Sequence, residues 1–346
     1  MRARQVLSAA IALAAALLLP HQAARADEPL KISVGWVVIS ADMIPLIYEK
    51  PDILKYYGKT YTVEPMRFQG TSPQITALAA GQLDIASLAY SSFALAIENA
   101  HLDDLRIIAD GFQDGHPGYY SLTYLVRNDS GIARVEDLKG KIMAINTIGS
   151  AVDIAGRAVL AKHGLMFPRD YSIVEAPFPA LGAMLLEKKA DVVLLGEPFS
   201  NAPDIQKEAH TLFTMRDGMG ASQMIVMTAR ADYLEKNRAA LDDFFDDMVR
   251  GIHWMLNPAH RAEAIRFVAG AAKQSESLFT PYYLTHKDEY YDPNAMPDLA
   301  ALQRNIDAQV TFGFLKRSID VRKYADLSFV ERAAKRYAKE DTASAN

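Results

Sequence analysis

The 346-residue sequence contains no cysteine, so it forms no disulfide and offers no thiolate to zinc or to a redox reaction. The same absence excludes a lipoprotein anchored through a thiol. Histidine is sparse: none of the eight lies three or four residues from another, and no H-E-x-x-H motif occurs. There is also no P-loop, no G-x-S-x-G elbow and no G-x-G-x-x-G motif. We therefore expect no metal, no cofactor, no catalytic residue and no enzymatic activity.

Long apolar runs are absent as well, apart from one at residues 6–19, which is shorter than the about 20 residues that cross a bilayer. Arg2 and Arg4 precede this run, and a small-x-small sequence at 24–26 follows it. The arrangement predicts a secretory signal peptide over residues 1–26, with a membrane anchor as the alternative. We expect a protein exported to the periplasm.

Basic residues are fewer than acidic ones. The chain has 37 basic and 42 acidic residues, a net charge of −5. Removing the predicted signal peptide removes three arginines and no acid, which leaves 34 basic against 42 acidic residues and a net charge of −8. This balance keeps an exported protein in solution and argues against a nucleic-acid partner.

Short strand-like runs alternate with helical ones along the chain, which predicts an α/β fold with mostly parallel sheets flanked by helices. Two such series are joined by a Gly/Pro-rich crossing at 114–118, and a return crossing lies near 218–222. The pattern predicts two lobes with a ligand cleft between them. Residues 27–116 with 223–340 would form the first lobe, and residues 117–222 the second.

Several short sequence motifs follow one another along the chain in a characteristic order and spacing. They are Gly35-Trp36, 68–74 (FQGTSPQ), 80–86 (AGQLDIA), 137–141 (DLKGK), 146–151 (NTIGSA), 196–199 (GEPF), 313–315 (GFL) and 319–321 (IDV). With them the chain resembles, from Lys31 to about Lys335, the periplasmic substrate-binding proteins of the nitrate/sulfonate/taurine type, which serve ABC importers. It also resembles their relatives that bind the pyrimidine precursor of thiamine.

The resemblance implies a type II periplasmic-binding-protein fold and a small-molecule ligand trapped by closure of the lobes. It also implies a membrane permease and a cytoplasmic ATPase as partners of a monomeric protein. The enzymatic branch of this family depends on a cysteine-rich stretch, which this sequence lacks.

The turn that contains Thr147, Gly149 and Ser150 is the first candidate for ligand binding. A strand ends there and a helix begins, so backbone N–H groups and the positive end of the helix dipole favour an anion. Ser150 also fits as the cap of its own helix, with Asp153 completing a box-like arrangement. Both roles are compatible, because a capping serine leaves other N–H groups free.

A matching turn in the first lobe contains Thr71 and Ser72, where Ser72 is expected to cap the helix and Thr71 to contact the ligand. Turn chemistry, helix capping or burial in the core explains the remaining candidates equally well. They are Trp36 and Val38 after the first strand, Tyr90 and Ser91 at a strand-to-helix turn, Asp114 and His116 at the crossing, Phe178, and Gln223 on the returning strand.

Glu197 conflicts with a simple anion, because a carboxylate beside the ligand would repel it. It fits a helix cap, or an acceptor for an N–H group of a zwitterion or nitrogen heterocycle. The expected ligand is a small organic anion or zwitterion of the sulfonate, nitrate, taurine or aromatic carboxylate class. The alternatives are a pyrimidine thiamine precursor, or presentation of a ligand to a membrane sensor kinase.

Overall fold

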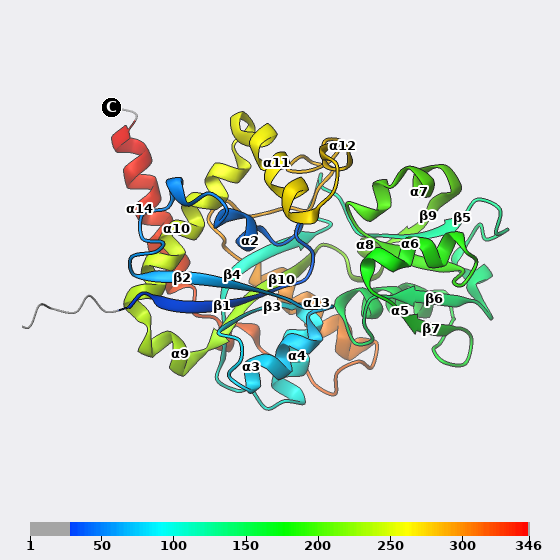
Figure 1. Cartoon of the computed structure of the whole chain (residues 1–346). Coiled ribbons are helices and arrows are strands. Elements are labelled where there is room, and N and C mark those ends of the chain that lie inside the picture. Colours follow the sequence, from blue (N-terminus) through cyan, green and yellow to red (C-terminus); the bar gives the residue numbers. More distant parts are fainter. Residues whose placement is uncertain (1–27, 345–346) are drawn as a thin grey trace, which may run out of the picture.

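The computed structural model describes residues 28–344, so the predicted signal peptide lies outside the described range. Two five-stranded sheets lie side by side, each flanked by helices (Figure 1). This arrangement confirms the predicted two-lobed α/β fold. None of the helices in the described range is long and apolar enough to cross a membrane.

The sheet of the first lobe has the order β2-β1-β3-β10-β4. Its strands are β1 (Leu30–Trp36), β2 (Tyr61–Arg67), β3 (Ile85–Ala89), β4 (Leu105–Asp114) and β10 (Ser222–Arg230). Strand β1 runs parallel to β2 and β3, whereas β10 runs antiparallel to β3 and β4. Strand β4 is therefore joined to the sheet only through β10.

The sheet of the second lobe repeats this plan with the order β7-β6-β8-β5-β9. Its strands are β5 (Thr123–Arg127), β6 (Ile142–Ile145), β7 (Ser172–Glu175), β8 (Val192–Leu195) and β9 (Ala209–Thr214). Strand β6 is parallel to β7 and β8, and β5 is antiparallel to β8 and β9. The predicted parallel pairs are thus combined with antiparallel ones, and both sheets are mixed.

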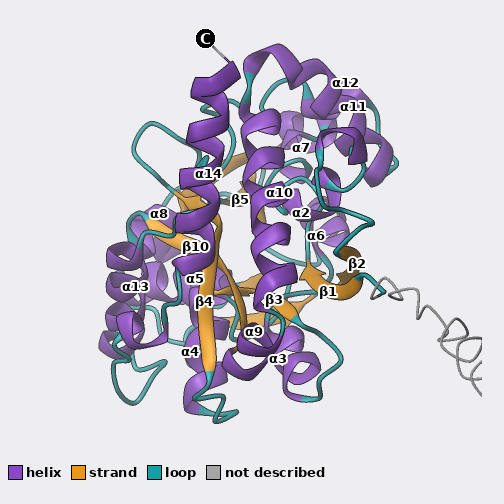
Figure 2. Ribbon diagram, turned by 90° about the vertical axis from the view of Figure 1, so that its left-hand side faces the viewer, coloured by secondary structure: helices purple, strands orange, loops and turns teal. Residues whose placement is uncertain are grey.

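Helices pack against both sheets (Figure 2). Those of the first lobe are α2 (Met43–Ile47), α3 (Ser72–Ala79), α4 (Tyr90–Glu98), α9 (Ala231–Lys236), α10 (Arg238–Leu256), α11 (Arg261–Ala272), α12 (Glu276–Phe279), α13 (Leu299–Thr311) and α14 (Ser328–Ser344). Those of the second lobe are α5 (Ala151–Lys162), α6 (Phe178–Leu186), α7 (Pro203–Glu208) and α8 (Met215–Met219).

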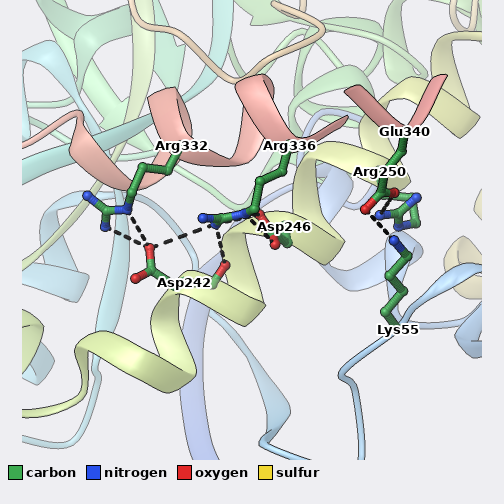
Figure 3. A network of polar contacts seen from close by, with 7 residues as sticks. All are labelled: Lys55, Asp242, Asp246, Arg250, Arg332, Arg336 and Glu340. Atoms are coloured by element: carbon green, nitrogen blue, oxygen red, sulfur yellow. Dashed lines mark hydrogen bonds and ion pairs between the residues drawn. The ribbon is translucent and has the colours of Figure 1, made fainter. Parts of the chain in front are cut away.

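The C-terminal helix α14 is fastened along α10 at the end of the first lobe that lies far from the second lobe (Figures 1 and 2). Seven side chains form this polar network (Figure 3): Lys55, Asp242, Asp246, Arg250, Arg332, Arg336 and Glu340. Arg332 donates to Asp242 at 2.6 Å and Arg336 donates to Asp246 at 2.7 Å. Because the network stands apart from the cleft, it supports the first lobe without entering the candidate site.

The chain passes between the lobes twice, after β4 and before β10, and side chains of the first lobe hold both crossings. The buried carboxylate of Asp114 accepts hydrogen bonds from the Leu122 N–H (2.7 Å) and the Ser121 hydroxyl (2.8 Å). Asn305 of α13 accepts from the Gln223 N–H (3.1 Å) and donates to the carbonyl of Met219 (3.3 Å). These contacts hold the chain in place where it passes between the lobes.

Candidate ligand-binding site

A cavity of about 70 Å³ lies between the two lobes. The lining residues of the first lobe are Val37, Val38, Ala41, Asp42, Thr71, Ser87, Ala89, Phe112, Met224, Ile225 and Glu289. Those of the crossing and the second lobe are Leu122, Asn146, Ser150, Val152, Phe178, Gly196, Glu197 and Phe199. Because both lobes contribute walls, a ligand in this cavity would contact both.

Two of the three carboxylates in the cavity wall follow the ends of strands. Asp42 lies after β1, where one of its oxygens accepts from the N–H groups of Val37 (3.0 Å) and Val38 (3.1 Å). Glu197 follows β8 and accepts from the side-chain amide of Asn201 (2.6 Å). Hydrogen bonds from the protein therefore hold an oxygen of each of these two carboxylates.

The third carboxylate, Glu289, comes from the segment between α12 and α13. Its neighbour Tyr290 pairs with Gln113 of β4 through two backbone hydrogen bonds of 2.8 and 3.1 Å. Glu289 is only 5% exposed, and within the described chain it forms no ion pair. Burial and the adjacent Glu289 together raise the pKa of Asp288 far above its ordinary value.

The cavity is therefore acidic, and among its described lining residues none is lysine, arginine or histidine. Burial, together with the charge of Glu289, raises the pKa of Asp42 to about 6 and that of Glu197 to about 7. Within residues 28–344, no group of three or more His, Asp or Glu side chains is arranged to hold a metal ion. The three carboxylates thus line the cavity without forming a metal-binding group.

We expect the ligand-free protein to lose stability as the pH rises from 5.5 to 7.5. Burial raises the pKa values of Asp42, Glu197 and also Asp114 (to about 7), and the charge of Glu289 contributes to the increase at all three. The charge of Arg216 lowers the pKa of Asp114 in part. Between pH 5.5 and 7.5 the folded state still binds protons that the unfolded chain has already released. The free energy of unfolding therefore falls as the pH rises through 6 to 7 and these carboxyl groups ionise. The melting temperature should be lower at pH 7.5 by roughly 3–6 °C. A higher melting temperature at pH 7.5 would contradict this electrostatic picture.

The turn before α5, predicted to bind an anion, is occupied by groups of the protein itself. Ser150 caps α5 as predicted, accepting from the Asp153 N–H at 3.4 Å. The Gly149 N–H donates to the carboxylate of Asp153 (2.9 Å), and the Ile148 N–H donates to that of Glu175 (2.5 Å). Protein carboxylates therefore stand at the positive end of this helix, where the ligand anion was expected.

The matching turn of the first lobe differs in detail from the prediction. Thr71 lines the cavity, and its hydroxyl oxygen lies 2.7 Å from that of Ser92. The predicted cap by Ser72 is wrong: α3 begins at Ser72, and its hydroxyl also faces Ser92, at 3.3 Å. Thr71 takes the cap position, because the helix begins one residue earlier than the serine-proline pair indicated.

The two lobes touch across the cleft near these turns. The Ser40 hydroxyl donates to the carbonyl of Glu197 (3.4 Å), and the Gln69 side chain donates to the carbonyl of Asn146 (3.5 Å). At Gly70 the approach is closest, since a Cβ atom there would lie 2.7 Å from the hydroxyl oxygen of Thr147. These contacts join the two lobes beside the cavity.

The structure distributes the predicted site residues over three places. Those that line the cavity are Val38, Thr71, Ser150, Phe178 and Glu197. Trp36 lies in an adjoining outer groove, which shares Val37, Val38, Phe178 and Phe199 with the cavity. Those that line neither are Ser72, Tyr90, Ser91, Asp114, His116, Thr147, Gly149 and Gln223.

Most residues in this last group have structural contacts. The buried Tyr90 donates from its hydroxyl to the Ala151 carbonyl (2.9 Å), and the His116 ring stacks on Tyr290 with ring centres 3.9 Å apart. The Gln223 side chain donates to the carbonyl of Ile225 (2.9 Å). These residues support the crossings and the cavity wall from behind.

The sequence reasoning missed several lining residues, above all Asp42, Asn146, Phe199 and Glu289. Asn146 and Phe199 belong to phrases that carried the family resemblance, so their positions were a usable signal. Asp42 and Glu289 lie outside those phrases, and no local pattern marked them.

The cavity between two lobes of mixed sheet is the arrangement of a two-lobed periplasmic-binding-protein fold. The chain belongs to the NMT1-like family, whose sequence profile matches residues 25–269. Among curated proteins, none matches the chain in sequence.

Solved structures share this fold at low sequence identity. The alkanesulfonate-binding protein SsuA from Xanthomonas axonopodis pv. citri, bound to MOPS, has a TM-score of 0.68 and 18% identity over 87% of this chain and 99% of its own. The nitrate-binding protein NrtA from Synechocystis PCC 6803 has a TM-score of 0.71 and 14% identity over 89% of both chains. The desulfurization enzyme DSZB has a TM-score of 0.62 and 13% identity over 89% of this chain and 99% of its own. The same fold thus serves binding proteins and an enzyme.

Proposed function

We propose that the protein is the periplasmic solute-binding component of an ABC importer. The observation that carries the proposal is the cavity whose walls come from both lobes. Similarity to sulfonate- and nitrate-binding proteins supports it. A permease in the membrane and a cytoplasmic ATPase would receive the solute from a monomeric binding protein exported through its signal peptide.

The proposed mechanism is closure of residues 117–222 onto residues 27–116 and 223–340, with rotation at the two crossings. The role is binding without turnover. The hydroxyls in the cavity wall belong to Thr71, Ser87 and Ser150, and within the described chain none of them is hydrogen-bonded to a His, Lys, Asp or Glu side chain that could activate it. Because DSZB shares the fold, chemical change of the bound solute is the outcome that would contradict this role.

The ligand predicted from the sequence is an organic anion or a zwitterion, and the acidic lining favours the zwitterion. Its negative end has a suitable position in the outer groove, which is lined by Arg67. The Arg67 guanidinium lies 5.6 Å from the centre of the Trp36 ring.

A disulfide across the cleft tests closure and capture directly. A Cβ on Gly70 would lie 3.4 Å from the Cβ of Thr147, close to the about 3.8 Å that a disulfide requires. The natural chain has no cysteine, so Gly70→Cys with Thr147→Cys would form a single defined bond. Oxidation should hold the lobes together, and reduction should increase the radius of gyration measured by small-angle X-ray scattering.

Solute trapped by oxidation during expression should survive dialysis and appear in mass spectra of the denatured protein. The reduced protein should lose it, and the single Thr147→Cys variant provides the control for exchange. If reduction changes neither the radius of gyration nor the retention of solute, the closure mechanism is contradicted.

A further inference from the structure

We infer that the ligand carries a positively charged nitrogen, and that Asp42, Glu197 and Glu289 bind it in the cavity between the lobes. The inference rests on the proposed solute-binding function and names the chemical class of its ligand.

The first argument is the charge of the cavity wall. Three carboxylates from distant parts of the chain meet there, and none of the described lining residues is basic. Buried carboxylates are costly unless a positive charge or several hydrogen bonds compensate them. Asp42 accepts from two backbone N–H groups and Glu197 from the amide of Asn201, but among the described residues no Lys, Arg or His lines the cavity beside any of the three carboxylates. In a binding protein, a cationic ligand supplies the compensating charge when the cleft closes.

Unpartnered polar groups in the same wall are independent evidence for a ligand with polar atoms. Ser87 and Asn146 are each only 4% exposed, and both line the cavity. Among the described residues, the Ser87 hydroxyl has no hydrogen bond. The side-chain oxygen Oδ1 of Asn146 accepts from the Ser150 hydroxyl (3.2 Å), but the side-chain nitrogen Nδ2 has no acceptor within the described chain. Ser87 therefore offers an acceptor, and Asn146 a donor, to a bound molecule.

A simple anion does not fit this wall. The helix terminus that would attract it already faces the carboxylates of Asp153 and Glu175. An anion in the cavity would also meet three more carboxylates, at an electrostatic cost that a protonated amine avoids. The acidic wall therefore distinguishes this cavity from one built for nitrate or a simple sulfonate.

Most of the remaining wall is apolar and determines which ligand body fits the cavity. The rings of Phe178 and Phe199 lie nearly parallel, with an angle of 2° and centres 6.5 Å apart. Both rings border the cavity and the outer groove, where Arg67 lies. A fitting ligand would place its charged nitrogen beside the carboxylates of the cavity and its apolar body along the two rings. Any negative group would lie in the outer groove near Arg67.

The test compares four probes that share a benzene ring. They are 2-phenylethylamine, phenylalanine, benzenesulfonate and 2-phenylethanol, each titrated into the purified protein by calorimetry at pH 7.5. The amine and the zwitterion should bind, whereas the sulfonate and the alcohol should bind at least tenfold more weakly. Tighter binding of benzenesulfonate, or no binding of either amine-bearing probe, would overturn the inference.

Charge-neutral variants identify the groups responsible. Glu289→Gln and Glu197→Gln keep the shape of the side chain, and each should weaken binding of 2-phenylethylamine by about tenfold. The matched control is Glu64→Gln, because Glu64 pairs with Lys31 on the exposed surface and should leave affinity unchanged. Both cavity variants should keep the melting temperature of the free protein or raise it, since each removes a buried charge. Unchanged amine affinity in both variants would overturn the assignment.

The disulfide experiment separates this inference from the function on which it rests. If oxidised Gly70→Cys/Thr147→Cys protein traps a solute while the amine probes fail, the protein is a solute-binding protein of another ligand class. If neither trapping nor lobe opening occurs, the proposed function itself has failed.

Discussion

Replacing Asp247 with alanine should lower the free energy of unfolding by about 3–5 kcal/mol, the largest effect expected from a single substitution in this protein. Asp247 lies on α10 and is 0% exposed. Its carboxylate accepts hydrogen bonds from the N–H groups of Lys55 (2.7 Å), Tyr56 (2.9 Å) and Tyr57 (3.0 Å) and from the hydroxyl of Tyr61 (2.9 Å). Alanine would leave all four donors without their acceptor.

Two other aspartates of α10, Asp246 and Asp243, have different contacts from Asp247 and therefore serve for comparison. Asp246 points to Arg336 of α14 (Figure 3), whereas Asp247 fastens the loop that leads into β2. Urea denaturation followed by circular dichroism measures the loss. Asp243→Ala is the matched control, because Asp243 lies on the same helix without an ion pair or side-chain hydrogen bond in the described chain, and its loss should cost less than about 0.5 kcal/mol. Equal effects for the two variants would show that the buried acceptor contributes no special stability.

Gly218→Ala should destabilise the second lobe by about 2–3 kcal/mol, because α8 lies directly against the backbone of α5. A Cβ at Gly218 would lie 2.6 Å from the carbonyl oxygen of Ala155 and 3.2 Å from a methyl group of Val159. The first neighbour is backbone in the middle of a helix, which cannot move aside as a flexible side chain does. Thermal unfolding should show the loss as a lower melting temperature.

Gly270→Ala is the control for this prediction. Gly270 lies within α11, and nothing lies within 4 Å of the position that its Cβ would take. Alanine there should raise stability by about 0.5–1 kcal/mol, since glycine costs more backbone entropy in a helix. If alanine at Gly218 were also stabilising, α8 and α5 would have to move apart at little cost, which would contradict the prediction.

The sequence was sufficient to predict features of the site that depend on neighbouring residues. It was not sufficient to predict which distant charged side chains surround the site. The cap at Ser150 was predictable because it depends on residues within one turn of each other. The lining role of Glu197 was predictable from its place after a strand. The carboxylate of Glu175, which occupies the expected anion position, reaches the turn from the adjacent strand β7, and only the sheet pairing brings it there.

Glu289 likewise could not be assigned to the cavity from the sequence, because a contact with a distant part of the chain positions it. It is one of 42 acidic residues, and it lies in a segment with neither helix nor strand around it. Its position depends on the pairing of Tyr290 with Gln113, far away in the sequence. Hydrophobic periodicity carries no information about such a contact, so the acidic character of the cavity became evident only from the fold.

The position of β10 between β3 and β4 in the first sheet dictates an order of assembly. Among the strands of its sheet, β4 pairs only with β10, so the sheet of the first lobe stays incomplete until residues 222–230 are available. All strands of the second sheet lie between residues 123 and 214 and can join earlier. A chain that emerges from its N-terminus would therefore complete its second lobe first, while β3 and β4 expose strand edges that favour aggregation. The nascent first lobe is the part of this molecule with the greatest need of a chaperone.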